Sequence, residues 1–96
     1  IASKGAVHAF TRELAVELAQ HNITVNSIAP GYFATEMNTA LIENKEFNDW
    51  VCKRTPAGRW GRIEEIGPPC VFLASDEASY VNGHVLAVDG AFTVSA

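Results

Sequence analysis

The stretch from Ile23 to Thr35, ITVNSIAPGYFAT, contains the residue types that best suggest a binding site. Its β-branched and apolar residues favour an extended strand, and Pro30 removes a backbone donor, so the strand must end and the chain must turn. Ligands of open α/β sheets bind outside the carboxyl ends of the strands. Gly31 would let the backbone approach such a ligand closely, and Thr35 would offer it a hydroxyl. The alternative is an ordinary strand-to-helix turn in which Thr35 caps the next helix.

The cysteines and histidines of this sequence do not indicate a further functional site. Cys52 and Cys70 are far apart and have no neighbouring pair of histidines, so neither a metal site nor a disulfide framework is indicated. His8, His21 and His84 are interpreted as surface or cap residues. We therefore expect a protein of the reducing cytoplasm without a metal centre.

Length and composition restrict the classes of protein further. The 96 residues suffice for one small domain, and no apolar run approaches the roughly 18 residues of a membrane span. The net charge of −4 argues against a nucleic-acid partner, since such proteins present a basic face. The chain begins without Met, in what is predicted to be the first turn of a helix, so we expect a piece of a longer protein.

Hydrophobic periodicity predicts the elements that position the binding stretch. Apolar residues recur every three or four positions from Ser3 to Gln20, which predicts an amphipathic helix, with Asn22 as a left-handed cap before a strand at Ile23. Capping residues with acidic neighbours predict two short helices, beginning near Thr35 and near Asn44.

The rest of the chain is predicted to contain a loop, a helix and a strand. The segment Ala57 to Gly61 is too rich in glycine for a regular element and is expected to pack through Trp60. Ile63 to Ser75 is expected to be mostly helical, with the regular helix starting near Pro68 or kinked there. Asn82-Gly83 is a turn signal, and the apolar strand from His84 to Val88 is expected to be buried on both faces, as in a parallel sheet.

Three stretches of the sequence, in this order and spacing, resemble the short-chain dehydrogenase/reductase family, whose members are Rossmann-type oxidoreductases that use NAD or NADP. They are Ala2-Ser3-Lys4-Gly5-Ala6; Asn26-Ser27-Ile28-Ala29-Pro30-Gly31 with Thr35; and a C-terminal signature comprising Arg59-Trp60-Gly61, Phe72-Leu73-Ala74-Ser75-Asp76 and Val88-Asp89-Gly90. The resemblance implies that residues 1–96 are a single partial domain, the C-terminal part of an α/β, doubly wound parallel sheet with about two strands and three to four helices.

The resemblance also implies roles for individual residues. Lys4 matches the catalytic lysine, whose ammonium lowers the pKa of a tyrosine four positions earlier and holds the ribose of the nicotinamide. That tyrosine would precede Ile1, and the Gly-rich phosphate loop is absent, so the chain alone is expected to be inactive. The alternative for Lys4 is an ordinary exposed lysine near a helix start. Pro30, Gly31, Phe33 and Thr35 match the residues that shape and contact the nicotinamide part of the cofactor.

Substrate contacts are expected from Tyr32, Met37 and Trp50, although aromatic and Met side chains are often plain core. Arg54 and Arg59 could meet an acidic substrate, or could form structural ion pairs. The closest resemblance within the family is to sugar-acid dehydrogenases, and 3-oxoacyl carrier-protein reductases share much of the pattern.

A different class of function is also open, a non-catalytic assembly module. The family resemblance implies a homo-oligomer built through the first helix and through the last helix and strand, and a two-stranded sheet left alone invites pairing with another copy. We also expect a small-molecule substrate as a partner. We expect no binding to nucleic acid or to a membrane.

Overall fold

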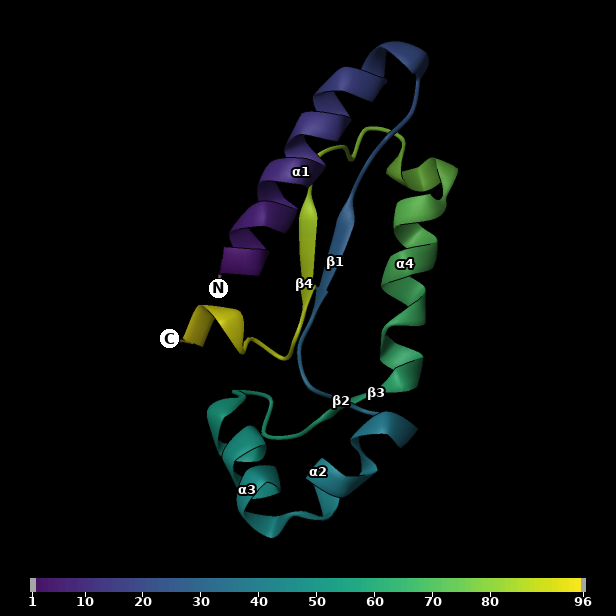
Figure 1. Cartoon of the computed structure of the whole chain (residues 1–96). Helices are drawn as coiled ribbons and strands as arrows, with labels where there is room; N and C mark the ends of the chain where they lie inside the picture. Colours follow the sequence, from purple (N-terminus) through teal and green to yellow (C-terminus); the bar gives the residue numbers. More distant parts are fainter. Residues whose placement is uncertain (1, 96) are drawn as a thin grey trace. The chain divides into compact units, whose positions relative to one another are not determined.

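The computed structural model describes the backbone of residues 2–95 and the side chains of residues 5–95. The fold is α/β, as expected, with helices and short strands that alternate along the chain (Figure 1). Contacts between Cα atoms divide it into two compact units, residues 1–28 with 70–86 and residues 29–69 with 87–96. Among the described residues, no helix combines the length and the apolar character needed to cross a membrane.

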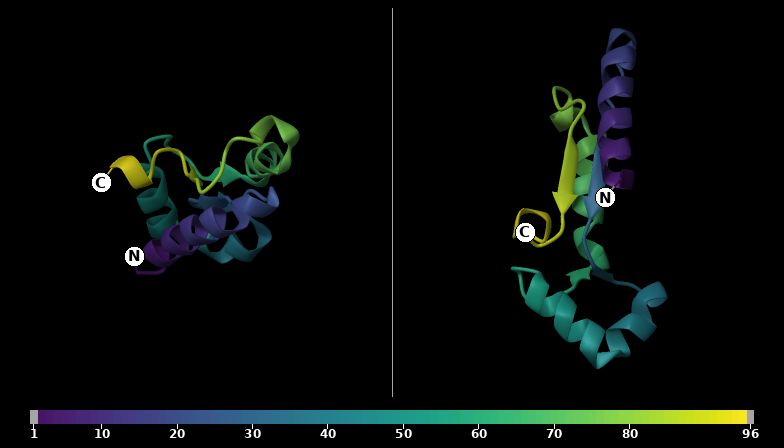
Figure 2. Two further views of the ribbon diagram at one scale, coloured as in Figure 1. Left: turned by 90° about the horizontal axis from the view of Figure 1, so that it is seen from above. Right: turned by 60° about the vertical axis from the view of Figure 1, so that its left-hand side comes forward.

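The first unit is built on the long helix α1, Ala2–Leu18, which continues as a 3₁₀ turn through His21. Asn22 ends it in the left-handed conformation with φ 61°, which confirms the predicted helix and cap. The helix runs beside β1 (Figure 2). The hydroxyls of Thr11 and Ser27 are hydrogen-bonded to each other. Phe10, one of the apolar residues that recur along this helix, is 65% exposed in the described chain.

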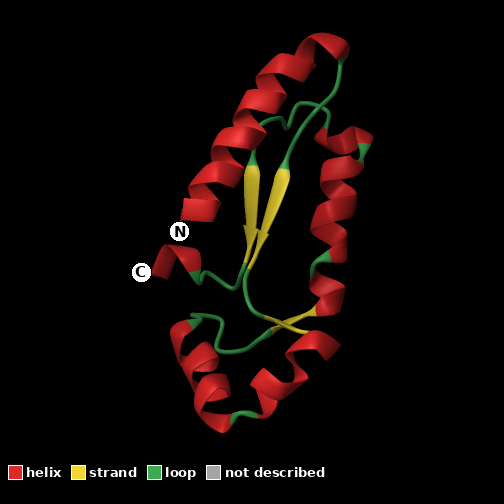
Figure 3. Ribbon diagram, viewed as in Figure 1, coloured by secondary structure: helices red, strands yellow, loops and turns green. Residues whose placement is uncertain are grey.

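The two longer strands are β1, Ser27–Pro30, and β4, Val85–Val88, which pair in one sheet and point the same way (Figure 3). The prediction of two parallel strands is therefore confirmed. The expected burial of β4 on both faces is not found, because Ala87 is exposed in this chain.

The predicted start of the first strand at Ile23 is wrong, since the ladder begins four residues later at Ser27. Asparagine side chains replace the backbone ladder over the preceding residues: Val25 N donates to Asn82 Oδ1 at 2.8 Å, and His84 N donates to Asn26 Oδ1 at 2.9 Å. The segment is held next to the residues that precede β4 by these side chains and by the backbone hydrogen bond from Gly83 N to Val25 O at 2.8 Å.

The second unit contains the turn after β1 and a pair of helices. Its elements are β2, Phe33–Ala34; a 3₁₀ turn, Glu36–Asn38; α2, Thr39–Glu43; α3, Lys45–Arg54; and β3, Gly61–Arg62. Both short helices were predicted, and the Asn44 side chain caps α3 by accepting a hydrogen bond from Phe47 N at 3.1 Å. The unit packs around Val51, which is fully buried, and around Phe33 and Trp60.

The segment predicted as a loop contains a strand that the sequence did not indicate. Gly61 and Arg62 form β3, which pairs in parallel with β2 in the register Phe33 with Gly61 and Ala34 with Arg62. The expected packing through Trp60 is confirmed. A 3₁₀ turn at Ile63–Glu65 follows, and helix α4 is Gly67–Ala74, so the regular helix does begin next to Pro68 as expected.

Candidate functional site

The loop from Pro30 to Thr35 begins where β1 ends, and Gly31 fixes its start. Gly31 N donates to Val88 O at 3.0 Å. A Cβ on Gly31 would lie 2.7 Å from Asp89 Cβ and 2.8 Å from Asp89 Cα, closer than side chains tolerate. Gly31 therefore closely approaches the main chain after β4, and glycine is required for this contact. The expected approach of Gly31 to a ligand stays a prediction. Pro30 is the exposed last residue of β1.

The middle of the loop is strand β2, which is held by hydrogen bonds from Gly61 of β3 and from Asn38. Gly61 N donates to Tyr32 O at 2.8 Å, and the Asn38 side chain donates to Phe33 O at 2.7 Å. The Phe33 ring covers Gly61 so closely that a Cβ there would lie 2.7 Å from Phe33 Cε2. These contacts fix the backbone of the residue expected to meet the nicotinamide carboxamide.

Thr35 stands at the N-cap position of the next 3₁₀ turn, but its side chain makes no capping hydrogen bond. Its backbone is extended, with φ −120° and ψ 167°, and the residue is half-buried. Thr35 is therefore the N-cap residue by position, as the alternative interpretation expected, but it does not cap the turn through its side chain. The contact of its hydroxyl with a cofactor stays a prediction.

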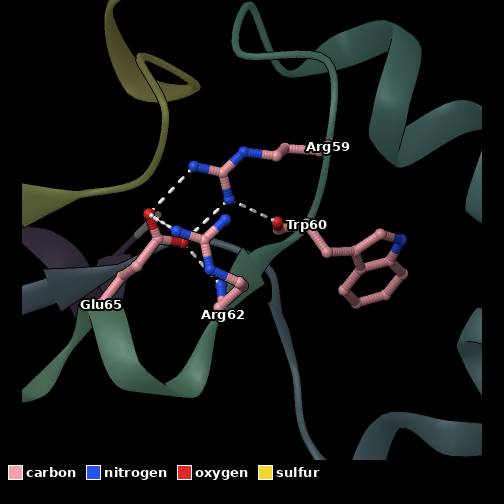
Figure 4. A network of polar contacts seen from close by, with 4 residues as sticks. All are labelled: Arg59, Trp60, Arg62 and Glu65. Carbon is pink, nitrogen blue, oxygen red and sulfur yellow. Dashed lines mark hydrogen bonds and ion pairs between the residues drawn. The ribbon is translucent and has the colours of Figure 1, made fainter.

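An ion-pair network holds β3, to which the loop is paired (Figure 4). The Arg59 guanidinium donates to both carboxylate oxygens of Glu65, at 2.8 and 2.9 Å, and Arg62 N donates to Glu65 Oε1 at 2.8 Å. The hydrogen bonds from Arg59, followed by that from the Arg62 backbone, lower the pKa of Glu65 to about 2. Arg59 is used in a structural ion pair, one of the two roles considered for it.

Four aromatic rings surround that of Tyr32 in the second unit. Its ring meets four others edge-on, with centroid distances of 5.6 to 5.9 Å: Phe47, Trp50, Trp60 and Phe92. Two of the expected substrate residues, Tyr32 and Trp50, are thus in contact with each other. The third, Met37, is 94% exposed and stands apart from the cluster.

Polar contacts fasten this cluster at both ends. Trp60 Nε1 donates to Asn48 Oδ1 at 2.7 Å. The Arg54 guanidinium lies 4.3 Å from the centroid of Phe92 and donates to Ser95 Oγ at 2.6 Å. Arg54, considered as a substrate contact or an ion-pair partner, instead secures the C-terminal turn to α3.

A pocket of about 200 Å³ opens beside the loop, within the second unit. Its wall consists of Tyr32, Phe33, Thr55, Ala57, Arg59, Gly61, Glu65, Val88, Asp89 and Gly90. The charged groups on this wall have partners in the chain: Arg59 binds Glu65, and the Asp89 carboxylate accepts hydrogen bonds from Ala91 N and Thr93 N. The pocket supplies shape and backbone groups rather than a nucleophile or a base.

Sequence reasoning did not assign Thr55 or Glu65 to this region. The signal that could have located the pocket is the pair of recognisable turns that border it, Arg59-Trp60-Gly61 and Val88-Asp89-Gly90. Lys4 belongs to α1 by its backbone, but its side chain lies outside the described residues, so its catalytic role stays a prediction. No group of three or more His, Cys, Asp or Glu suited to a metal ion occurs among the described residues.

Known proteins resemble this chain along nearly its whole length. Residues 1–93 match the family model described as enoyl-(acyl carrier protein) reductase. The 5-keto-D-gluconate 5-reductase of Escherichia coli K12 is 57% identical over 94 residues, and the gluconate 5-dehydrogenase of Gluconobacter oxydans is 54% identical over 94 residues. Each alignment covers 98% of this chain but only 37% of the relative.

A solved structure of a similar protein has the same fold over the part that matches this chain. The gluconate 5-dehydrogenase of Burkholderia cenocepacia, crystallised with NADP and tartrate, is 48% identical and superposes with a TM-score of 0.89 over 97% of this chain and 36% of its own. The resemblance inferred from the three sequence stretches is confirmed: the chain belongs to the short-chain dehydrogenase/reductase family.

Proposed function

We propose that the chain is the C-terminal part of an NAD(P)-dependent oxidoreductase that acts on the carbonyl or secondary alcohol of a sugar acid. The observation that carries this proposal is the 57% identity to a 5-keto-D-gluconate 5-reductase over 94 residues, 98% of this chain. Because the chain spans about 37% of that relative's length, the activity is assigned to a polypeptide that also contains the rest of the domain.

The Pro30–Thr35 loop has a backbone and a hydroxyl that suit the binding of a nicotinamide cofactor. The loop backbone is fixed at Gly31 and Phe33, and the Thr35 hydroxyl is not consumed by helix capping. A bound nicotinamide would supply or accept the hydride. In this proposal Thr35 and the Phe33 backbone orient it, and Pro30 and Gly31 shape the turn that brings them to it.

We propose that a tyrosine, which would precede Ile1, donates or accepts the proton in this reaction. Lys4 is the residue of this chain that we propose acts on that tyrosine. A lysine ammonium nearby favours the phenolate and so lowers the pKa of the tyrosine toward the working pH. The chain alone, without that tyrosine and without a Gly-rich loop, is proposed to be inactive.

A chimera tests the proposal directly. The segment of the Escherichia coli relative that aligns with this chain is replaced by residues 1–96, and NADPH consumption is measured with 5-keto-D-gluconate. We expect activity within about tenfold of the parent's, because half or more of the aligned residues are identical. A folded chimera that ignores the keto sugar acid but reduces a 3-oxoacyl thioester would replace this proposal with the carrier-protein reductase.

Two variants of the chimera test the residue roles. Lys4→Met should lower kcat by about a hundredfold or more, whereas Lys53→Met, at an exposed lysine of α3, should not. Thr35→Val should raise the KM for NADPH about tenfold, the effect of one lost hydrogen bond to a polar or charged cofactor group. The control is Thr39→Val, because the Thr39 hydroxyl donates to Glu36 O within its own helix turn.

The assembly proposal rests on apolar side chains that the described chain leaves exposed. Val16 of α1 is 80% exposed and Val71 of α4 is 69% exposed, together with Phe10. We propose a homo-oligomer through α1 and through α4 and β4, in the cytoplasm, where Cys52 and Cys70 would remain reduced. A monomeric sedimentation coefficient at micromolar concentration would contradict the oligomer without touching the catalytic proposal.

A further inference from the structure

The turn Asn82-Gly83 lies outside the proposed catalytic region, and its chemistry has no part in the proposed reaction. An asparagine followed by glycine is the pair whose main chain most easily closes on the side chain, because glycine has no Cβ to obstruct the ring. Gly83 has φ +79°, a conformation open to glycine and strained for other residues. We propose that Asn82-Gly83 is a deamidation site that the folded first unit keeps dormant.

The reaction itself needs only water. The Gly83 amide nitrogen, after loss of its proton, attacks Asn82 Cγ, and the new C–N bond closes a five-membered succinimide. The Cγ–Nδ2 bond breaks, and Nδ2 leaves as ammonia after taking up a proton. Water then opens either carbonyl of the ring, which gives aspartate or isoaspartate. No oxidation or reduction occurs at any step.

The fold restrains both reacting groups. Gly83 N donates to Val25 O at 2.8 Å, so its proton is held in a hydrogen bond. The side chain of Asn82 accepts from Val25 N at 2.8 Å through Oδ1 and donates to Ala15 O at 3.4 Å through Nδ2. Attack requires the carboxamide to rotate toward Gly83 N, which breaks these contacts. The rate should therefore follow the opening of this turn.

Asn26 holds the same turn from its other sides and takes no part in the chemistry. Its Nδ2 donates to Val81 O at 2.9 Å, and its Oδ1 accepts from His84 N at 2.9 Å. The residues that flank Asn82-Gly83 are thus secured by a second asparagine. Removing this side chain should loosen the turn while the reacting pair stays unchanged.

Deamidation would in turn weaken the restraint. An aspartate at position 82 has no N–H to donate to Ala15 O and places an acceptor against that carbonyl. An isoaspartate adds a methylene to the main chain, which displaces Gly83 N from Val25 O. The modification would release the residues that precede β4 from the segment that precedes β1.

The test follows deamidation by mass-spectrometric peptide mapping of the polypeptide that carries this chain, at mildly alkaline pH. In the folded protein, modification at Asn82 should be at least about tenfold slower than in the same protein unfolded in urea. Asn26→Ala should raise the folded rate about three- to tenfold and leave the unfolded rate unchanged. The control is Asn48→Ala, which removes another hydrogen-bonded asparagine, in the second unit.

Two results would overturn the proposal. Equal rates in the folded and unfolded protein would mean that the fold offers no protection, and an unfolded chain that stays unmodified at Asn82 would mean that the site is not reactive. The comparison of folded and unfolded wild-type protein decides the question even if Asn26→Ala fails to fold.

Discussion

Gly31→Ala should destabilise the protein because the space for a side chain is already filled. The added Cβ would lie 2.7 Å from Asp89 Cβ and 2.8 Å from Asp89 Cα, where 3.4 to 4 Å is ordinary contact. Asp89 Cα is main chain, so the overlap cannot be relieved by turning a flexible side chain. The loop must therefore move away from the residues after β4, and the 3.0 Å hydrogen bond from Gly31 N to Val88 O lengthens.

The expected magnitude follows from three effects. Overpacking costs about 1–3 kcal/mol, and the weakened hydrogen bond adds about 1 kcal/mol. Alanine also restricts the unfolded chain, which returns about 0.4–1 kcal/mol, and the φ of Gly31 is not positive, so no backbone strain is added. The free energy of unfolding should fall by about 2 kcal/mol, or about 1 M in the urea midpoint at a slope of about 2 kcal/mol/M.

Urea unfolding followed by tryptophan fluorescence measures this effect, since Trp50 and Trp60 both lie in the second unit with Gly31. The control is Gly5→Ala in α1, where nothing lies within 4 Å of the new Cβ. That variant should be neutral or slightly more stable. Equal midpoints for Gly31→Ala and Gly5→Ala would refute the close approach of the loop to Asp89.

Three further substitutions test the second unit. The pKa of Glu65 is lowered from 4.5 to about 2, so the ionised carboxylate stabilises the folded state fully above pH 4.5, and this contribution is lost as the pH falls toward 2. Glu65→Gln should therefore flatten this part of the pH–stability curve, which is measured as the urea midpoint at a series of acidic pH values. Trp60→Phe removes the hydrogen bond to Asn48 and should cost about 1–3 kcal/mol of unfolding free energy, with the urea midpoint as the measurement. Phe92→Leu removes the contact of the Phe92 ring with Tyr32 and its stacking with the Arg54 guanidinium. It should lower the free energy of unfolding by about 1–2 kcal/mol, which is measured as a lower Tm.

The local elements were predictable because their signals lie within a few residues of each other. The 3.6-residue period of α1, the left-handed Asn22 and the Asn44 cap each depend on neighbouring positions. The missed features depend on distant residues. Strand β3 exists only because Gly61 pairs with Phe33, and a glycine-rich segment by itself gives no sign of such a partner.

The candidate site was predictable to a similar extent. The types of Gly31 and Thr35 predicted a loop that approaches a ligand closely and offers it a hydroxyl. The structure shows Gly31 close to Asp89 and Thr35 without a side-chain capping hydrogen bond, and the two ligand contacts stay predictions. The contact of Tyr32 with Trp50 and the exposure of Met37 could not be predicted, because all three residue types favour burial. Which of them joins the cluster is decided by the path of α2 and α3, and the sequence pattern does not specify that path.

Three glycines of the stretches that identified the family, Gly31, Gly61 and Gly90, share one physical cause. In each case the missing Cβ leaves room for a residue from another part of the second unit: Asp89 at Gly31 and the Phe33 ring at Gly61. At Gly90 a Cβ would lie 2.9 Å from Ala57 Cβ, and Gly90 O accepts a hydrogen bond from Ala57 N at 3.1 Å. These turns therefore have to occur together, because each one supplies the surface against which another closes. A substitution that fills one of these positions should disturb the Pro30–Thr35 loop through its neighbours.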